Sequence, residues 1–336
     1  IIVSFFLILI TIGFINFLSS ISRFDNARIL DKIVKQATIL GVSFIVFFVT
    51  AHSKTGNIIY KIISKPSFRF FIFLSSIIIF LIIAVGPASI FPTINGGKGW
   101  VHIGPISIQV PEIFKVPFII VLASILARGK DDKKEIPYKK NFFSVVFYTI
   151  VFFIIITYPL HDMGTAIHYV MIADYKRHRV KAFIDGILHS NYTREDSYQI
   201  YQSLIAFGTG GVLGKGFGNG VQKYNYIPEV ETDFAIANFA EETGFIGMLI
   251  ILFSFFSLFF LIMGVANNAK NYFSKYLVGG IAGYLITQVI INVGVAIGLL
   301  PVFGIPLPFI SSGGSSLLAI SMSMGLVIYI NNRQIS

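Results

Sequence analysis

Long uncharged stretches alternate with short charged ones along this chain of 336 residues. A helix needs about 20 apolar residues to cross a bilayer, and most of the uncharged stretches approach or exceed that length. The last stretch, 276–332, is too long for one helix, and the prolines and glycines at 301–314 divide it into two spans. The pattern therefore predicts eight spans, which lie in 1–22, 36–53, 70–97, 112–127, 141–160, 243–269 and the two parts of 276–332.

The composition agrees with this pattern and narrows the class of protein. Hydrophobic residues make up 55% of the chain and charged residues 12%, whereas soluble domains carry about 25% charged residues. We therefore expect an all-α, polytopic bundle of membrane helices that forms a single membrane domain over residues 1–336. The chain has no cysteine, which excludes disulfides and cysteine-type zinc sites. The net charge of +10 does not indicate nucleic acid, because the basic residues lie between the spans, where they act as topology signals.

The distribution of lysine and arginine predicts the orientation of the spans. Three connections are rich in them and are expected in the cytoplasm, namely 54–69, 128–140 and the one that follows residue 269. The segment 300–314 has no charge and is expected outside, together with a long polar loop, 161–240. One connection is an exception, because 23–35 would also lie outside although it carries four basic residues and two acidic ones. The majority places both termini in the cytoplasm.

Five of the 16 acidic residues lie in one short stretch, EVETDFAIANFAEE at 229–242. Asp233 stands out, because Thr232 and Phe234 flank it. On one interpretation Thr232 and Asp233 begin the following helix, as a cap and a first-turn acid. On the other, Asp233 is a general base, partly desolvated by Phe234 and Phe239, that accepts a proton from a hydroxyl. The local sequence does not separate these two interpretations.

Glycines dominate the stretch GTGGVLGKGFGNG at 208–220. A nucleotide-binding P-loop would need Ser or Thr after its lysine, and here Gly216 follows Lys215. The stretch is therefore either a flexible loop or a segment whose main chain approaches a ligand closely.

Two further groups of charges have both a structural and a functional interpretation. The run KRHR at 176–179 is either a surface anchor or a site for phosphate, which arginine binds bidentately. Glu112 and Lys115 are either a structural pair along one helix or part of a cavity wall. Together these features indicate that the outer face handles a lipid substrate that carries phosphate and hydroxyl groups.

Several ordered motifs resemble those of one family of bacterial membrane proteins. They are GFGNGVQKYNYIPEVETDF at 216–234, AEETGFIG at 240–247, INVGVAIGLLPVFGIPLPFISSGGSSLL at 291–318, HDMGTA at 161–166 and QVPEIFK at 109–115. The stretch from about residue 97 to the C-terminus is similar to the SEDS family (shape, elongation, division and sporulation), whose members include FtsW, RodA and SpoVE.

The resemblance implies a peptidoglycan glycosyltransferase of the bacterial cytoplasmic membrane. Its substrate would be lipid II, the undecaprenyl-pyrophosphate-linked disaccharide pentapeptide, polymerised at the outer face. Its partners would be a class B penicillin-binding protein, which is a transpeptidase, and other membrane proteins of the division or elongation machinery. A divalent cation, Mg or Mn, would assist the leaving group, and no organic cofactor is expected. The PLPFIS run and the YIPE spacing favour the cell-division branch.

The resemblance also assigns roles to residues. Asp233 would be the catalytic base. The substrate-binding residues would be Glu112, Lys115, Arg177, Arg179, Lys215, Gln222, Lys223, Glu242 and Ser311. Glu241 and Glu242 are expected to support or position the substrate, and Glu229 and Glu231 are expected to be solvated. Two other functions stay open, a lipid II flippase that uses Glu112 and Lys115, and a non-catalytic scaffold that activates a penicillin-binding protein.

The chain departs from the family in one long feature. The family type has ten spans, and about eight are complete here. The uncharged run 163–173 has 11 residues, which is too short to cross a bilayer at about 1.5 Å per residue. This predicts that a helical hairpin is missing between residues 173 and 174. Since both its ends would lie outside, the remaining topology is unchanged. A real deletion would remove a lateral wall of the substrate cavity and would favour the scaffold.

Overall fold

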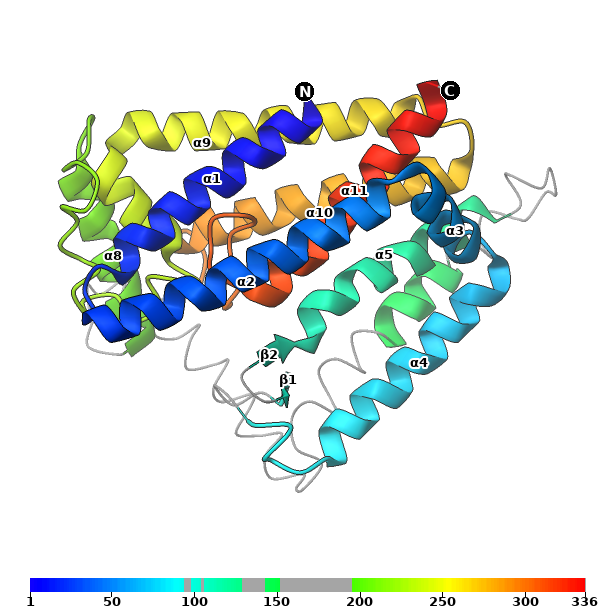
Figure 1. The fold of residues 1–336 in the computed structure, drawn as a ribbon, viewed down its shortest axis with the longest axis horizontal. Coiled ribbons are helices and arrows are strands. Elements are labelled where there is room, and N and C mark those ends of the chain that lie inside the picture. The colour runs from blue at the N-terminus through cyan, green and yellow to red at the C-terminus, as the bar shows by residue number, and fades with distance from the viewer. Residues whose placement is uncertain (94–97, 104–105, 129–142, 152–194, 336) are drawn as a thin grey trace. The chain divides into compact units, whose positions relative to one another are not determined.

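The structure is a computed structural model that describes residues 1–93, 98–103, 106–128, 143–151 and 195–335 (Figure 1). The predicted gap at 173–174 lies outside these residues, as do Arg177 and Arg179. The labelled helices are α1 (Ile2–Ile21), α2 (Asn26–Ala51), α3 (Ser53–Ile63), α4 (Pro66–Val85), α5 (Val110–Ala127), α8 (Glu195–Gly210), α9 (Ala235–Asn267), α10 (Tyr272–Ala296) and α11 (Gly314–Ile335).

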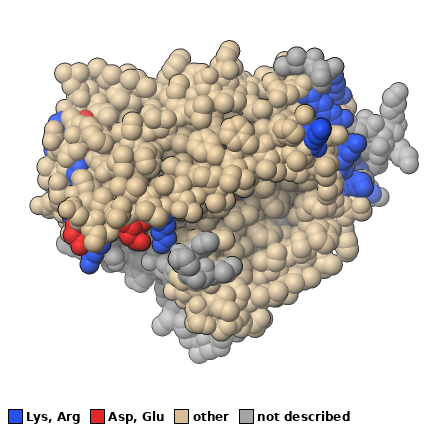
Figure 2. Space-filling view, viewed as in Figure 1, with Lys and Arg blue, Asp and Glu red and all other residues tan. Residues whose placement is uncertain are grey.

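Most of these helices are long and apolar, which confirms the expected polytopic membrane fold. In the described part of the chain, six are long and apolar enough to cross a membrane, namely α1, α2, α5, α9, α10 and α11. A shorter apolar helix covers Phe70–Val85 within α4. Of the span predicted at 141–160, residues 143–151 are helical and the rest lies outside the described residues. Figure 2 shows a face that is uncharged over most of its area, as a lipid-facing surface requires.

The structure corrects one predicted connection and adds one pair of strands. The connection after the first span was expected at 23–35, but α2 already begins at Asn26, so that most of its charged residues lie on a helix. Charge marks where the hydrocarbon region ends, whereas a helix can continue into water. The sequence pattern also missed a hairpin of two antiparallel strands, β1 (Trp100–Ile103) and β2 (Ile106–Gln109), because strands of four residues are too short to show a clear period.

The hairpin leads directly into α5, which begins at Val110. Pro111 lies in the first turn of this helix, where its missing N–H costs nothing. Glu112 also lies in the first turn, where a carboxylate interacts favourably with the helix dipole. The Glu112–Lys115 pair is therefore near the end of α5 and not at its middle.

The chain forms two compact units, which are described separately. Unit 1 contains Ile1–Gly41, Ala173–Leu261 and Tyr284–Leu317, and unit 2 contains Val42–Ile172, Ile262–Gly283 and Leu318–Ser336. In unit 2 the helices approach closely through small residues, as membrane helices commonly do. A Cβ atom added to Gly325 would lie 2.7 Å from the carbonyl oxygen of Phe47. The hydroxyls of Tyr60 and Ser274 are 2.8 Å apart.

In unit 1, α1 packs on the beginning of α9 through buried amides. Asn16 Nδ2 donates to Ala235 O at 2.9 Å, and Asn238 Nδ2 donates to Asn16 Oδ1 at 2.9 Å. The rings of Phe6 and Phe309 meet edge to face, with centroids 5.5 Å apart. These contacts fix α1 against both α9 and the non-helical segment 297–313.

A sharp kink divides α9 at Gly244, whose φ of 66° and ψ of −164° are not helical. Only glycine readily adopts this region. The freed main chain pairs with the preceding loop, because Phe245 N donates to Gly211 O at 2.9 Å and Ile246 N donates to Val212 O at 3.2 Å. The kink therefore separates a short helix, 235–243, from the long apolar helix 245–267.

We expect Gly244→Ala to destabilise the protein strongly. The new side chain would adopt a strained conformation that costs about 1–3 kcal/mol, and its Cβ would lie only 2.6 Å from Val212 O. The matched control is Gly264→Ala on the same helix, where nothing lies within 4 Å and where alanine should stabilise by roughly 0.5–1 kcal/mol. Thermal unfolding in detergent, followed by circular dichroism, measures both. Equal melting temperatures for the two variants would contradict the kink's role.

Candidate active site

Asp233 lies in unit 1 at the end of the turn-rich segment 228–234, directly before α9. Its side chain is half-buried, whereas the neighbouring Phe234 is completely buried. The hydroxyl of Thr232 does not form the expected helix cap, because it donates instead to Glu229 Oε2 at 2.6 Å. The main-chain amide of Phe234 donates to Glu229 O at 3.1 Å, which closes the turn before the helix.

Three consecutive carbonyl groups hold this segment in place. Glu231 O accepts from both the amide and the hydroxyl of Ser312, at 2.9 and 2.8 Å. Thr232 O accepts from the hydroxyl of Ser311. Asp233 O accepts from Asn292 Nδ2 at 2.7 Å. The donors belong to α10 and to the segment 297–313, so distant parts of the chain fix the main chain on both sides of the Asp233 side chain.

The carboxylate of Asp233 faces a glycine. Gly304 has a φ of 69°, and a Cβ atom added to it would lie 3.5 Å from Asp233 Oδ2. Ser311, which was predicted to bind substrate, is engaged within the protein, since its hydroxyl also accepts from the Leu307 amide at 2.8 Å. Its geometry therefore supports the segment that carries Asp233.

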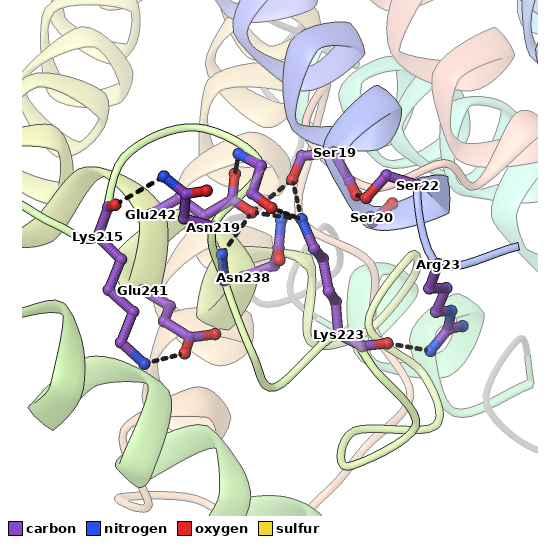
Figure 3. A network of polar contacts seen from close by, with 12 residues as sticks. Ser19, Ser20, Ser22, Arg23, Lys215, Asn219, Lys223, Asn238, Glu241 and Glu242 are labelled. Atoms are coloured by element: carbon purple, nitrogen blue, oxygen red, sulfur yellow. Dashed lines mark hydrogen bonds and ion pairs between the residues drawn. The ribbon is translucent and has the colours of Figure 1, made fainter.

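The carboxylate of Glu241 organises part of the glycine-rich loop. It is completely buried and accepts from Lys215 Nζ at 2.6 Å, from Val221 N at 3.0 Å and from Gln222 N at 3.0 Å (Figure 3). The main chain adds two bonds, because Lys215 N donates to Glu241 O and Gly216 N to Glu242 O, both at 3.0 Å. The loop is thus folded tightly against the short first helix of α9.

Glu242 and Lys223 form a buried ion pair beside it, 2.9 Å apart (Figure 3). Glu242 also accepts from the amides of Gly218 and Gly220, at 3.1 and 3.3 Å. Lys223 also donates to Ser19 Oγ at 2.9 Å and to Gly218 O at 2.8 Å, so its three ammonium protons all have acceptors. The Lys223 side chain is 0% exposed and that of Glu242 is 2% exposed.

The structure brings some of the predicted substrate-binding residues together, and their binding roles stay predictions. One hydrogen-bond network contains Lys215, Gln222, Lys223 and Glu242. Of its two lysines, Lys215 has a side chain that is 28% exposed, whereas that of Lys223 is buried. In unit 2, Lys115 pairs with Glu112 and is 29% exposed. The other carboxylate oxygen of Glu112, Oε2, is buried and has no hydrogen-bond partner among the described residues.

The structure also corrects one expectation and adds residues that the sequence did not single out. Glu231 was expected to be solvated, but its side chain is 13% exposed and pairs with Arg23 and Lys32. Asn292 and Ser312 lie within the matched motif at 291–318 but carried no chemical signal of their own. Within the described residues, no three His, Asp or Glu side chains lie together to hold a metal ion. The expected divalent cation thus has no described ligand cluster.

We expect the single variants Lys223→Met and Glu242→Gln each to lower the stability of the protein, because each leaves a buried charge unpaired. The cost of such a loss is typically about 3–5 kcal/mol. The double variant should lose less than the sum, because it buries no charge. Melting temperatures in detergent measure this, with Asp25→Asn as control, since the Asp25–Arg28 pair is exposed. An unchanged melting temperature for Lys223→Met would contradict a structural role.

Comparison with known proteins identifies relatives of this chain. The family model FTSW_RODA_SPOVE, described as "Cell cycle protein", matches residues 1–173 and 163–335. The two matched segments overlap over residues 163–173, directly before the point where the missing hairpin is predicted. A curated relative from Coxiella burnetii, "Probable peptidoglycan glycosyltransferase FtsW", is 35% identical over 286 residues, which cover 74% of this chain and 75% of the relative.

Solved structures show the same fold. The crystal structure of the rod shape determining protein RodA of Thermus thermophilus matches with a TM-score of 0.68 and 22% identity, over 100% of this chain and 97% of that one. A chain from a structure titled "Structural coordination of polymerization and crosslinking by a peptidoglycan synthase complex" matches with a TM-score of 0.67 and 22% identity, over 99% and 97%. The family match along the whole described chain confirms the resemblance seen in the motifs, and the chain belongs to the FtsW/RodA/SpoVE family of cell cycle proteins.

Proposed function

We propose that this protein is a peptidoglycan glycosyltransferase that polymerises lipid II, with Asp233 as its general base. Family membership and the name of the Coxiella burnetii relative support the reaction class. One observation supports the residue above all. Asp233 has a half-buried side chain on a segment whose three successive carbonyls are each held by hydrogen bonds from elsewhere in unit 1. A carboxylate held in this way is positioned for proton transfer.

The proposed reaction needs one proton acceptor. Asp233 takes the proton from the 4-hydroxyl of the acceptor sugar as that oxygen attacks the anomeric carbon of the donor chain. The bond between the anomeric carbon and the diphosphate oxygen breaks, and undecaprenyl diphosphate leaves with the bonding electron pair. Because Asp233 keeps part of its surface exposed, it can return the proton to water. The fixed main chain matters, because a shift of about 1 Å can cost 100-fold in rate.

The leaving diphosphate needs positive charge nearby, and side-chain exposure supports one of the candidate lysines over another. Among the described lysines of the predicted set, we favour Lys215 of unit 1, since it keeps more than a quarter of its side chain exposed. Lys115 of unit 2 stays a candidate. We assign Lys223 a structural role, because its ammonium is buried and all three protons are bonded. Arg177 and Arg179 stay candidates outside the described residues. A divalent cation stays a proposal, and no step here depends on it.

We propose that the loops of unit 1 face the outside and that both termini are cytoplasmic. The exception at 23–35 has a physical reason that supports this orientation. Arg23 and Lys32 both bind Glu231, and Arg28 pairs with Asp25, so three of the four basic residues have acidic partners. Paired charges are weak topology signals, and the connection is then compatible with the outer face.

The other two functions have weaker support. A flippase needs polar groups at the middle of the membrane, whereas Glu112 and Lys115 lie in the first two turns of α5. A scaffold would need no fixed carboxylate. As partner we propose a class B penicillin-binding protein, which the solved peptidoglycan synthase complex supports. The FtsW name of the relative supports the division branch.

We expect Asp233→Ala to abolish glycan synthesis. Purified protein with its partner should polymerise lipid II, and loss of the base should slow this by about 100- to 10,000-fold. Asp25→Asn is the matched control, since it removes an exposed carboxylate from the same unit, and its rate should be unchanged. An Asp233→Ala variant that makes glycan at the normal rate would disprove the assignment. Movement of labelled lipid II across vesicles that is lost in Lys115→Ala would support transport instead.

The proposed orientation predicts a labelling pattern. The chain has no cysteine, so a single introduced thiol reports its own side of the membrane. Arg28→Cys should react with an impermeant maleimide added to intact cells, because Arg28 is exposed in the first turn of α2, in unit 1. Lys61→Cys in α3, which is also exposed, should react only after permeabilisation. The reverse pattern would show that the orientation is wrong.

A further inference from the structure

Glu231 lies two residues before Asp233 and forms ion pairs with two cations. One is Arg23, in the connection between α1 and α2, and the other is Lys32, in α2. Arg23 Nη2 is 3.2 Å from Glu231 Oε1, and Lys32 Nζ is 2.7 Å from Glu231 Oε2. Each carboxylate oxygen thus has its own cationic donor. The side chains of Arg23 and Glu231 are 9% and 13% exposed, so this is a largely desolvated group and not a surface pair of small effect.

Arg23 and Glu231 also form hydrogen bonds with two further segments of the chain. Arg23 Nη1 donates to Lys223 O at 2.7 Å, which ties the connection between α1 and α2 to the glycine-rich loop (Figure 3). The main-chain carbonyl of Glu231 accepts two hydrogen bonds from Ser312, which ties it to the segment after α10. The ring of Phe24 contacts both cations, because the Arg23 guanidinium and the Lys32 ammonium each lie 4.7 Å from its centre.

We infer that Arg23, Lys32 and Glu231 form an ion clamp that positions the carboxylate of Asp233. The inference rests on the proposed role of Asp233 as base. The segment 228–234 is neither helix nor strand, so it has no regular ladder of main-chain hydrogen bonds to resist displacement. The clamp holds it from the side of α1 and α2, while Asn292, Ser311 and Ser312 hold it from the other side.

The clamp positions Asp233 and takes no part in the proton transfer itself. Glu231 is held by both its side chain and its carbonyl, and Phe234 is completely buried. Asp233 lies between these two fixed points, and part of its surface is exposed. Losing the clamp would weaken the first fixed point, which would then be held only through its carbonyl. It would also leave Arg23 with a largely buried, unpaired charge, which favours movement of the connection between α1 and α2. Glu231, Arg23 and Lys32 are therefore positioning residues.

The test compares two neighbouring glutamates in the lipid II polymerisation assay. Glu231→Gln should lower kcat by about 10- to 100-fold and leave KM nearly unchanged, because substrate contacts are retained. Glu229→Gln removes the same charge two residues earlier, where the exposed side chain accepts a hydrogen bond from the Thr232 hydroxyl, and kcat should stay normal. Glu231→Asp keeps the charge and should recover part of kcat. Normal kcat in Glu231→Gln, or equal losses in both glutamine variants, would overturn the clamp.

A second measurement tests the clamp without relying on activity. In the cysteine-free chain, Asp233→Cys provides one thiol at the position in question, and its rate of modification by a methanethiosulfonate reagent reports the local geometry. Adding Glu231→Gln should raise this rate several-fold, whereas adding Glu229→Gln should not change it. Equal rates in all three proteins would disprove the clamp. If the wild-type protein made no glycan although the rates changed as expected, the proposed function would fail and the clamp would stand.

Discussion

Main chain that leaves the helix and becomes buried must find partners for its polar groups within the protein, because water no longer reaches them. Two adjacent carboxylates meet this constraint for the glycine-rich loop. Glu241 and Glu242 accept from four main-chain amides, two lysines and the Ser19 hydroxyl. The kink at Gly244 follows immediately and lets the loop pair with the next turn of α9. Asp233 lies at the other end of the short helix against which this loop packs.

The five acids of 229–242 therefore have distinct physical roles although they are close in sequence. Glu241 and Glu242 are buried and fold the loop. Glu231 is largely buried and paired with two cations, while Glu229 is exposed and closes a turn with Thr232. Asp233 combines a half-exposed side chain with a main chain held at three successive carbonyls. A concentration of carboxylates is thus explained mainly by structure, and only one member has the geometry expected of a base.

The helices and their order were predictable from the sequence, because about 20 apolar residues in a row have few alternatives to a membrane helix. The motifs also led to Asp233. The partners of the acidic residues were not predictable, because they come from far along the chain. Ser19 meets Glu242 across 223 positions, and Arg23 meets Glu231 across 208. For the same reason the sequence does not show that Lys223 is buried and Lys215 partly exposed.

The charges of the first connection connect topology with the active site. Counting basic residues treats each as a solvated charge that resists transfer across the membrane. Arg23 and Lys32 are not of that kind, because Glu231 neutralises one of the two charges and burial removes most of the solvent from Arg23. On the proposed orientation, Arg23 and Lys32 lie outside, against the charge rule, because they hold the Asp233 segment through Glu231. A basic residue in an outer loop of a membrane protein is therefore a reason to search for a carboxylate that pairs with it.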